Sequence, residues 1–285
     1  MKVSKWRDEP LLETPMIEPA YDRESTLELL SLCKELPSLP DRFVKIQKII
    51  KDSDSDAHDL AEVIRSDQAT STMILKVANS AAFNPANTPV GELSKAITRL
   101  GSRETAHIAS TMSLMYGLCL STDMAIIRAF WAHAFGVAIL TEHLAKQIDP
   151  DQNNISHELA FMTGLLHDIG RVALGLNVDF SYFEQETGHL HGDALIEMEE
   201  ACYGVNHDEA GMRLLRMWNC PEDMCLAIGE CHKPESSLLA RLCHTADMYA
   251  TAHLSDCAAL ECMHEKISDS LAQNPIDISS FQLHT

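Results

Sequence analysis

Hydrophobic residues recur along this chain at the three- and four-residue spacing of an amphipathic helix. Phe43, Ile46, Ile49 and Ile50 form one such stripe, and comparable stripes follow through most of the sequence. No long alternating run rich in Val, Ile or Thr interrupts them, and helix-forming residues dominate between the breaks. The pattern therefore predicts an all-α protein.

The breaks between stripes predict two packed helical lobes. Residues 1–24 form a Pro-punctuated extension, residues 25–120 an N-terminal lobe, residues 121–255 a second helical bundle, and residues 256–285 a last helix and tail. The boundary is placed at Ser121-Thr122-Asp123, a polar break that suits a helix start. From there we expect helices at about 123–147, 155–169, 190–203, 207–218, 222–231, 237–253 and 257–272.

Local signals mark some helix ends in the first lobe. Asp54 or Asp56 can cap the helix that carries Leu60, and Gly101 suits the position just after a helix. A longer helix then runs from Ser102 to Cys119. The polar pair Asn79-Ser80 either ends a helix through local side-chain bonds or caps the cleft between the lobes.

Composition narrows the classes of function. The 285 residues are 46% hydrophobic, enough for a sizeable core, and the net charge of −20 leaves no basic surface for a nucleic-acid backbone. The N-terminus lacks the apolar core of a signal peptide, and the apolar stretch 125–140 is too short to span a bilayer. The nine cysteines lack paired metal-ligand spacing. We expect a cytoplasmic protein with reduced thiols that binds neither nucleic acid nor membrane.

Candidate chemistry is concentrated in Leu165-Leu166-His167-Asp168-Ile169-Gly170. A histidine and an aspartate stand side by side at the end of an apolar, helix-patterned segment, where burial without a partner is costly. Both are ligands for hard or borderline metals. The alternative is a helix-end pair that contacts nearby backbone, with Gly170 as the first residue beyond the helix.

Two further histidines lie on apolar stripes of other predicted helices. His133 shares a face with Phe130, and the alternative for it is a core histidine bonded to a backbone carbonyl. His207 follows Asn206, a good helix cap, and Glu209 completes a sequence typical of a capping box. A helix N-terminus disfavours imidazolium, so we expect a neutral His207 ring that is able to ligate, unless it only begins the helix.

The last two candidates come late in the chain. His232 precedes Lys233-Pro234, where a helix must end, and the alternative is an exposed helix-end histidine. Asp247 lies on or beside a buried stripe, and the alternative is a salt bridge with Arg241 or Lys233. Together the six candidates predict a metal site built between helices of a bundle: His133, His167, Asp168, His207, His232 and Asp247.

These motifs resemble the HD superfamily of metal-dependent phosphohydrolases, and within it the HD-related output domain (HDOD) branch. The resemblance covers about residues 30–255. It rests on Phe130-Trp131-Ala132-His133, Gly164–Gly170 and Tyr203–His207, and in the first half on Leu36–Pro40, Leu60–Ile64, Ser66–Gln68, Ile74–Ser80 and Ala96–Gly101.

The resemblance implies a ligand set and an activity. His133, His167, Asp168 and Asp247 match the superfamily's core ligands, while His207 and His232 match the histidines that hold a second metal in HD-GYP relatives. Asp168 would then bridge two divalent ions, with iron or manganese most typical, in a phosphohydrolase or phosphodiesterase.

The chain also departs from the HD-GYP pattern. Cys231-His232 replaces two adjacent histidines, Lys233-Pro234-Glu235-Ser236 replaces the Gly-Tyr-Pro element, and Arg171 replaces a lysine. Arg171 and Lys233 are expected to face a phosphate-ester or nucleotide ligand, although Arg171 also suits a helix C-terminus. The alternative function is a catalytically inactive regulatory module that acts through contacts with a signalling protein.

Overall fold

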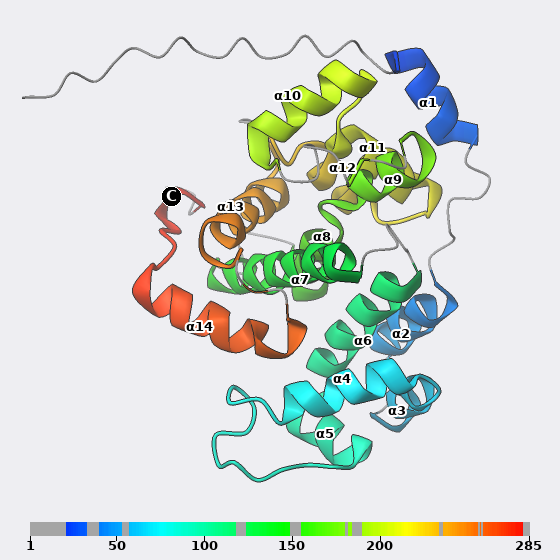
Figure 1. Ribbon diagram of the computed structural model, residues 1–285. Coiled ribbons are helices and arrows are strands. Elements are labelled where there is room, and N and C mark those ends of the chain that lie inside the picture. Colours follow the sequence, from blue (N-terminus) through cyan, green and yellow to red (C-terminus); the bar gives the residue numbers. More distant parts are fainter. Residues whose placement is uncertain are drawn as a thin grey trace, which may run out of the picture.

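The computed structural model describes residues 21–32, 40–52, 57–117, 124–148, 155–179, 182–183, 190–233, 236–255, 257 and 259–281. These residues form helices and connecting turns, without a strand among them, as the hydrophobic pattern predicts. The helices lie in two packed groups, one above the other in Figure 1.

Among the described residues, the lower group contains five helices. They are α2 (Asp41–Lys51), α3 (Ala57–Arg65), α4 (Gln68–Ala78), α5 (Leu93–Leu100) and α6 (Ser102–Gly117). Helix α4 begins where the Asp67 side chain accepts a hydrogen bond from the Ala69 N–H, and α5 ends at Gly101, whose φ of 84° favours glycine. Asn79 ends α4 and bonds the backbone of Leu75 and Val90, so it is a helix terminator. The predicted caps Asp54 and Asp56 lie outside the described residues.

The upper group contains the candidate ligands. Its helices are α7 (Met124–Gln147), α8 (His157–Leu166), α9 (Ile169–Asn177), α10 (Gly192–Tyr203), α11 (His207–Met217), α12 (Glu222–Gly229) and α13 (Leu238–His253). The 3-10 turn η2 (Leu260–Cys262) and α14 (Met263–Gln273) follow. Helix α7 packs along α8 and α13 through the centre of the molecule, and α9 packs on α11 (Figure 1).

The structure corrects the predicted end of the helix at His167-Asp168. We expected Gly170 to lie just beyond a helix, but a turn at these two residues is followed directly by α9, which contains Gly170 in its first turn. The reason for the glycine is close packing: a Cβ on Gly170 would lie 1.8 Å from the His207 carbonyl oxygen on α11. The sequence signal of a helix end was therefore a signal of helix contact.

Helix α1 (Arg23–Leu32) packs on the upper group, against α9, although the sequence assigned residues 25–32 to the first lobe. The Tyr21 N–H donates to the Cys202 carbonyl, and Arg23 donates to the Gly204 carbonyl and pairs with Glu209 at 2.7 Å. Gly204 has a φ of 63° and lies so close to Arg23 that a Cβ would be 2.7 Å from its nitrogen. The proposed lobe boundary at residues 121–123 lies outside the described part of the chain.

Two helical segments have the length and apolar composition needed to cross a membrane, Ala125–Gln147 and His157–Asn177. The first extends beyond the apolar stretch judged too short from the sequence, so that length argument was wrong. In their most apolar windows, 61% and 89% of the residues are buried within the protein. Central helices that are covered by other helices have this composition without contacting lipid.

Candidate metal centre

Helices α7 and α13 bring His133 and Asp247 together. The His133 Nε2 lies 3.0 Å from Asp247 Oδ1, and the His133 and His167 rings are 5.3 Å apart between centroids. His133 thus faces a carboxylate and another imidazole, and Asp247 faces histidines. The alternatives were a core His133 bonded to a backbone carbonyl and an Asp247 paired with Arg241 or Lys233. The contacts observed for these two side chains are instead with each other and with His167.

His167 has one ring nitrogen fixed and the other available. Its Nδ1 lies 2.9 Å from the Gly164 carbonyl, which can only accept, so Nδ1 carries a proton. Its Nε2 lies 3.4 Å from Asp168 Oδ1 and 3.7 Å from Asp247 Oδ1. The Nε2 atoms of His133 and His167 are both buried without a hydrogen bond of acceptable geometry. Two orphaned imidazole nitrogens beside two carboxylates fit a divalent metal ion.

Asp168 lies between two sets of candidate ligands. Its Oδ1 is 3.4 Å from His167 Nε2 on one side and 3.6 Å from His207 Nε2 on the other, while Oδ2 accepts a hydrogen bond from Arg171 at 3.1 Å. Burial alone would raise the pKa of this carboxyl group, but the charges of His167, Arg171 and His207 hold it well below its usual range. An ionised Asp168 placed there can contact cations on both sides.

The second set consists of His207, Asp208 and His232. One ligand atom from each of the three lies within 4.8 Å of the other two, and the same holds for His133, His167 and Asp168. His207 Nε2 is 3.6 Å from Asp208 Oδ1, and His232 Nδ1 is 3.0 Å from the same oxygen. The His232 side chain is only 7% exposed, so it is not the exposed helix-end histidine that the sequence left open.

Glu199 of α10 contacts His207 at the ring nitrogen that does not face Asp168. This carboxylate is fully buried, and its Oε2 lies 2.7 Å from both the backbone N–H and Nδ1 of His207. The Tyr182 hydroxyl donates to its other oxygen. With Nδ1 held as a donor, Nε2 faces Asp168 and Asp208, the arrangement by which a carboxylate orients a metal-binding histidine.

The metal-free histidines favour the protonated state. Burial lowers the pKa of His167, but Asp168 and Asp247 outweigh it and raise that pKa to about 10. Burial also lowers the pKa of His207, yet Glu199, Asp168 and Asp208 raise it to about 9. The expected neutral His207 was therefore wrong for the metal-free site, because a buried carboxylate in contact outweighs a helix dipole. Asn206 does cap α11 as predicted, accepting from the Glu209 N–H.

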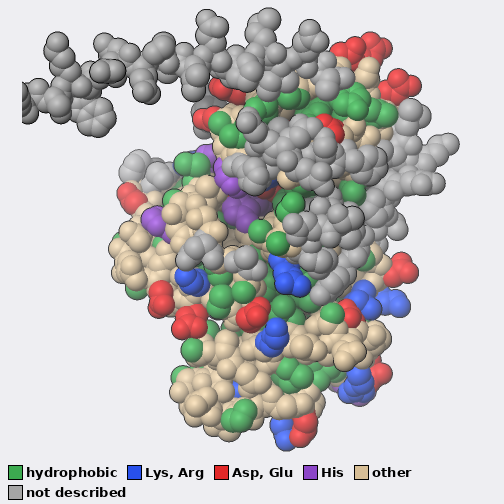
Figure 2. Space-filling model, viewed as in Figure 1, with side chains coloured by type: hydrophobic (Ala, Val, Ile, Leu, Met, Phe, Trp, Pro, Cys, Tyr) green, Lys and Arg blue, Asp and Glu red, His purple; other side chains and the backbone are tan. Residues whose placement is uncertain are grey.

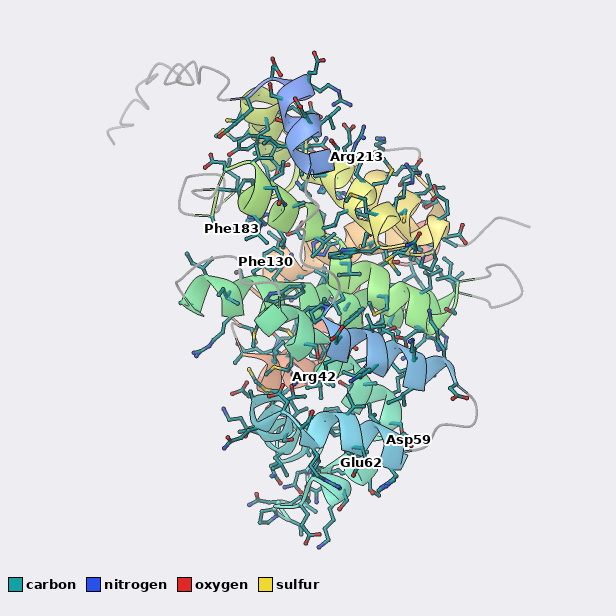
Figure 3. The ribbon with its side chains drawn as sticks, turned by 90° about the vertical axis from the view of Figure 1, so that its right-hand side faces the viewer. Arg42, Asp59, Glu62, Phe130, Phe183 and Arg213 are labelled. Carbon is teal, nitrogen blue, oxygen red and sulfur yellow. The ribbon has the colours of Figure 1, made fainter. Side chains whose placement is uncertain are left out.

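The two predicted phosphate contacts have different surroundings. Arg171 lies in the first turn of α9, not at a helix C-terminus, and is 4% exposed. Its guanidinium bonds Asp168 and lies 5.9 Å from the ring centroids of Tyr182 and Phe183. Phe130 of α7 contacts Phe183 edge-on, and the two residues are labelled one above the other in Figure 3. Lys233 is exposed and lines a cavity of about 500 Å³ beside His232.

Four residues of the centre were not singled out from the sequence: Asp208, Glu199, His191 and His244. Asp208 had the simplest signal, since it adjoins His207, but acidic residues in a first helical turn are common. The His191 ring lies 6.2 Å from that of His133, and the His244 ring 5.3 Å from that of His232. Histidine side chains reach the surface between α10 and α13 in Figure 2, so the centre adjoins solvent there.

Comparison with known proteins agrees with this architecture. Over 193 residues the chain is 27% identical to an uncharacterized protein of Treponema pallidum (strain Nichols), covering 66% of this chain but only 36% of that relative. Among solved structures, an HDOD domain protein of unknown function from Geobacter sulfurreducens matches with a TM-score of 0.64 and 20% identity, covering 92% of this chain and all of the other.

Two further structures share the fold. A "putative signal transduction protein" from Marinobacter aquaeolei VT8 has a TM-score of 0.63 and 20% identity, covering 94% of this chain and 62% of its own. A "putative metal-dependent phosphohydrolase" from Shewanella amazonensis SB2B has a TM-score of 0.53 and 19% identity, covering 88% and 89%. At these identities the likeness concerns the fold alone. The HDOD domain family itself matches residues 36–234, well over half of the sequence, and the chain belongs to this family.

Proposed function

We propose that this HDOD protein holds two divalent metal ions, iron or manganese, and hydrolyses a phosphate ester. The observation that carries the proposal is the position of Asp168 between two ligand sets, with its Oδ1 within 3.6 Å of histidines from both. The name of the Shewanella relative supports the same class of activity.

The chain supplies ligands and the groups that orient them. His133, His167, Asp168 and Asp247 would hold one ion, and His207 and His232 with Asp168 the other, with Asp208 either ligating or orienting His232. When bound, divalent ions would act as Lewis acids and would lower the pKa of a bound water molecule toward neutrality. The Gly164 carbonyl and Glu199 fix the two central imidazoles so that their Nε2 atoms face the carboxylates.

The two cationic side chains near the site, Arg171 and Lys233, are assigned different roles. Arg171 is buried and bonded to Asp168, so we assign it to holding that carboxylate ionised and in place. Lys233 is exposed in the cavity next to His232 and Asp208, and it is the better candidate for contact with a substrate phosphate or nucleotide. We also propose a cytoplasmic protein that works with a signalling partner and without direct nucleic-acid or membrane binding.

Two measurements on protein purified without chelators test the proposal. Elemental analysis should find close to two transition-metal ions per chain, and the loaded protein should hydrolyse bis-p-nitrophenyl phosphate. Asp168→Ala should abolish turnover and lose metal, whereas Asp269→Asn, an exposed carboxylate change on α14, should alter neither. Less than one ion per chain would refute the binuclear site.

One observation favours the second candidate, a regulatory module without turnover. Arg171, the residue that resemblance assigned to phosphate, points to Asp168 and is buried. A module of this kind would retain metal while a panel of phosphate esters and nucleotides, cyclic dinucleotides included, gives no turnover. The two functions are thus separated by activity at full metal content.

A further inference from the structure

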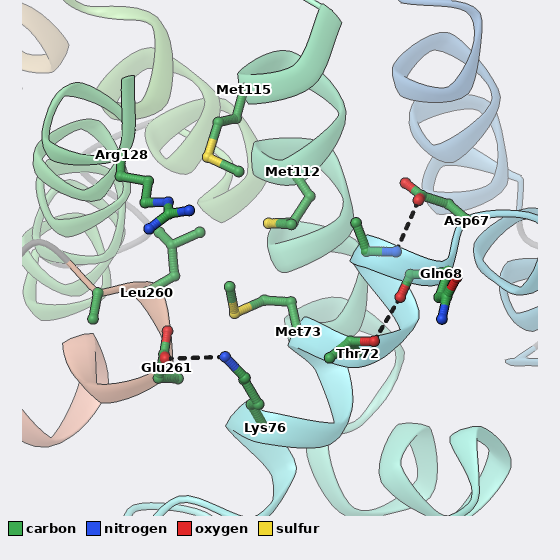
Figure 4. Close-up of a pocket in the computed structure, with 12 residues that line it drawn as sticks. Asp67, Gln68, Thr72, Met73, Lys76, Met112, Met115, Arg128, Leu260 and Glu261 are labelled. Carbon is green, nitrogen blue, oxygen red and sulfur yellow. Dashed lines mark hydrogen bonds and ion pairs between the residues drawn. The ribbon is translucent and has the colours of Figure 1, made fainter. Parts of the chain in front are cut away.

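A cavity of about 740 Å³ lies away from the metal ligands, where the lower helices meet the upper ones. Its walls come from α4 and α6 of the lower group and from α7 and η2 of the upper group, as Figure 4 shows. Ligand sites of proteins commonly have volumes of about 300–1,000 Å³ and often lie between domains. The size and position of this cavity are therefore those of a small-molecule site.

Three methionine side chains form much of the apolar part of the cavity, together with Leu260 and two alanines. Met73 of α4 and Met112 and Met115 of α6 converge on it in Figure 4. Met112 and Met115 are buried, which fixes their positions in the wall, while Met73 is partly exposed. Unbranched thioether side chains adapt to apolar and aromatic groups of varied shape.

A cation without a counter-charge projects from the opposite wall. Arg128 of α7 is exposed and makes no hydrogen bond or ion pair within the described part of the chain. The other charged groups of the cavity do have partners, since Lys76 lies 3.6 Å from Glu261 and Asp67 lies 2.6 Å from Arg42. In Figure 4 the Arg128 side chain extends from α7 toward Leu260 and the space near Met115.

We propose that this cavity binds a small amphipathic anion, with its carboxylate, sulfonate or phosphate on Arg128 and its apolar body against the three methionines. Charge complementarity selects an anion, because among the charged groups that line this cavity Arg128 is the one that no described residue pairs with. The methionine wall requires an apolar body attached to that anion. The site is separate from the metal centre and does not depend on its activity.

Such a ligand would join the two helical groups. Arg128 lies five residues before the ligand histidine His133 on the same helix, α7, whereas Met73 belongs to α4. A molecule bound to both stabilises the arrangement of α4 relative to α7 by mass action, since it binds the folded form alone. The cavity is thus suited to an input signal that acts on the arrangement of α7.

The test titrates the full chain with sodium octanoate and, in parallel, with 1-octanol by isothermal calorimetry. We expect saturable one-to-one binding of octanoate, with octanol at least about tenfold weaker because it lacks the charge. Arg128→Gln should weaken octanoate at least about tenfold, and Met73→Gln should also weaken it. The matched controls Arg65→Gln and Met248→Gln, at exposed positions on α3 and α13, should bind as the wild type does.

The proposal is overturned if octanoate shows no saturable binding, or if Arg128→Gln and octanol leave affinity unchanged. Analytical sedimentation of the ligand-free variants tests whether a second copy of the chain occupies the cavity. A change of association state in Arg128→Gln or Met73→Gln, absent from the controls, would show that a second copy of the chain fills the cavity instead of the anion.

Discussion

The contact between α9 and α11 offers a sharp test, because it is made by a glycine beside the metal centre. Gly170 packs directly on the first residue of α11, and a Cβ added there would lie 1.8 Å from the His207 carbonyl oxygen and 2.6 Å from the Gly211 nitrogen. Contacts of a real Cβ below 3.0 Å essentially never occur. Gly170→Ala must therefore push the two helices apart by more than about 1.2 Å, and both neighbouring atoms are backbone, which yields poorly.

This displacement has two measurable consequences. Overpacking of this kind costs about 1–3 kcal/mol of unfolding free energy, and the upper part of that range is expected here. The shift also moves His207 away from Asp168; in the wild type His207 Nε2 lies 3.6 Å from Asp168 Oδ1. This movement is much larger than the ~0.2 Å tolerance of metal–ligand distances. We expect Gly170→Ala to lose the metal ion proposed to bind at His207 even at temperatures where the variant stays folded.

Two other glycines serve as a graded comparison. Gly91 has nothing within 4 Å of its hypothetical Cβ, so Gly91→Ala should leave stability within about 1 kcal/mol of wild type and metal content unchanged. Gly211→Ala meets its nearest atoms at 3.2 Å and should fall between the two. Urea denaturation and elemental analysis of all three variants provide the assay. If Gly170→Ala matched Gly91→Ala in both measurements, the claim that close helix contact positions His207 would be refuted.

Three further predictions concern the groups that orient and protonate the ligands. Glu199→Gln removes the carboxylate charge next to His207 Nδ1 and should weaken one of the two proposed metal sites about 10- to 100-fold in a competitive chelator titration, leaving the other intact. Asp208→Asn should weaken metal at His232 in the same assay, and unchanged affinity would exclude it as a ligand or orienting group. In urea titrations the metal-free protein should lose stability as pH rises from 6.5 toward 10. The pKa values of His167 and His207 are raised in the folded state, so these rings stabilise the fold only while they stay protonated. Metal affinity should rise over the same pH range, because the metal needs the unprotonated nitrogens.

The helices of the second lobe were largely predictable, and α9 shows why one was not. Apolar stripes located α7, α10, α11, α12 and α13 within a few residues of their observed ends. Gly170 looked like a helix end because a glycine that ends a helix and one that admits a neighbouring helix are the same letter in a sequence. Only the position of α11, set by tertiary packing, distinguishes the two cases.

The positions of the candidate ligands were predictable, and their protonation state was not. Inward-facing stripes selected His133 and His207, and the structure brings both to the centre with His167, Asp168 and Asp247. The protonation of His207 depends instead on a carboxylate eight residues earlier, on another helix. Such a contact follows from how α10 packs beside α11, which no local pattern encodes.

The charges around the centre bear on what must occupy it. Four buried carboxylates surround the ligand histidines, Asp168, Asp208, Asp247 and Glu199, and among the described residues Arg171 is the buried arginine that faces them. Three negative charges would therefore be left without compensation in a poorly solvated place, which is a severe cost. Without metal, protons on the imidazoles supply part of the missing charge, and this is the physical cause of their raised pKa values. Metal ions that displaced those protons would supply more charge through the same nitrogen atoms, so the charge balance favours cations at this candidate centre whether or not it turns over a substrate.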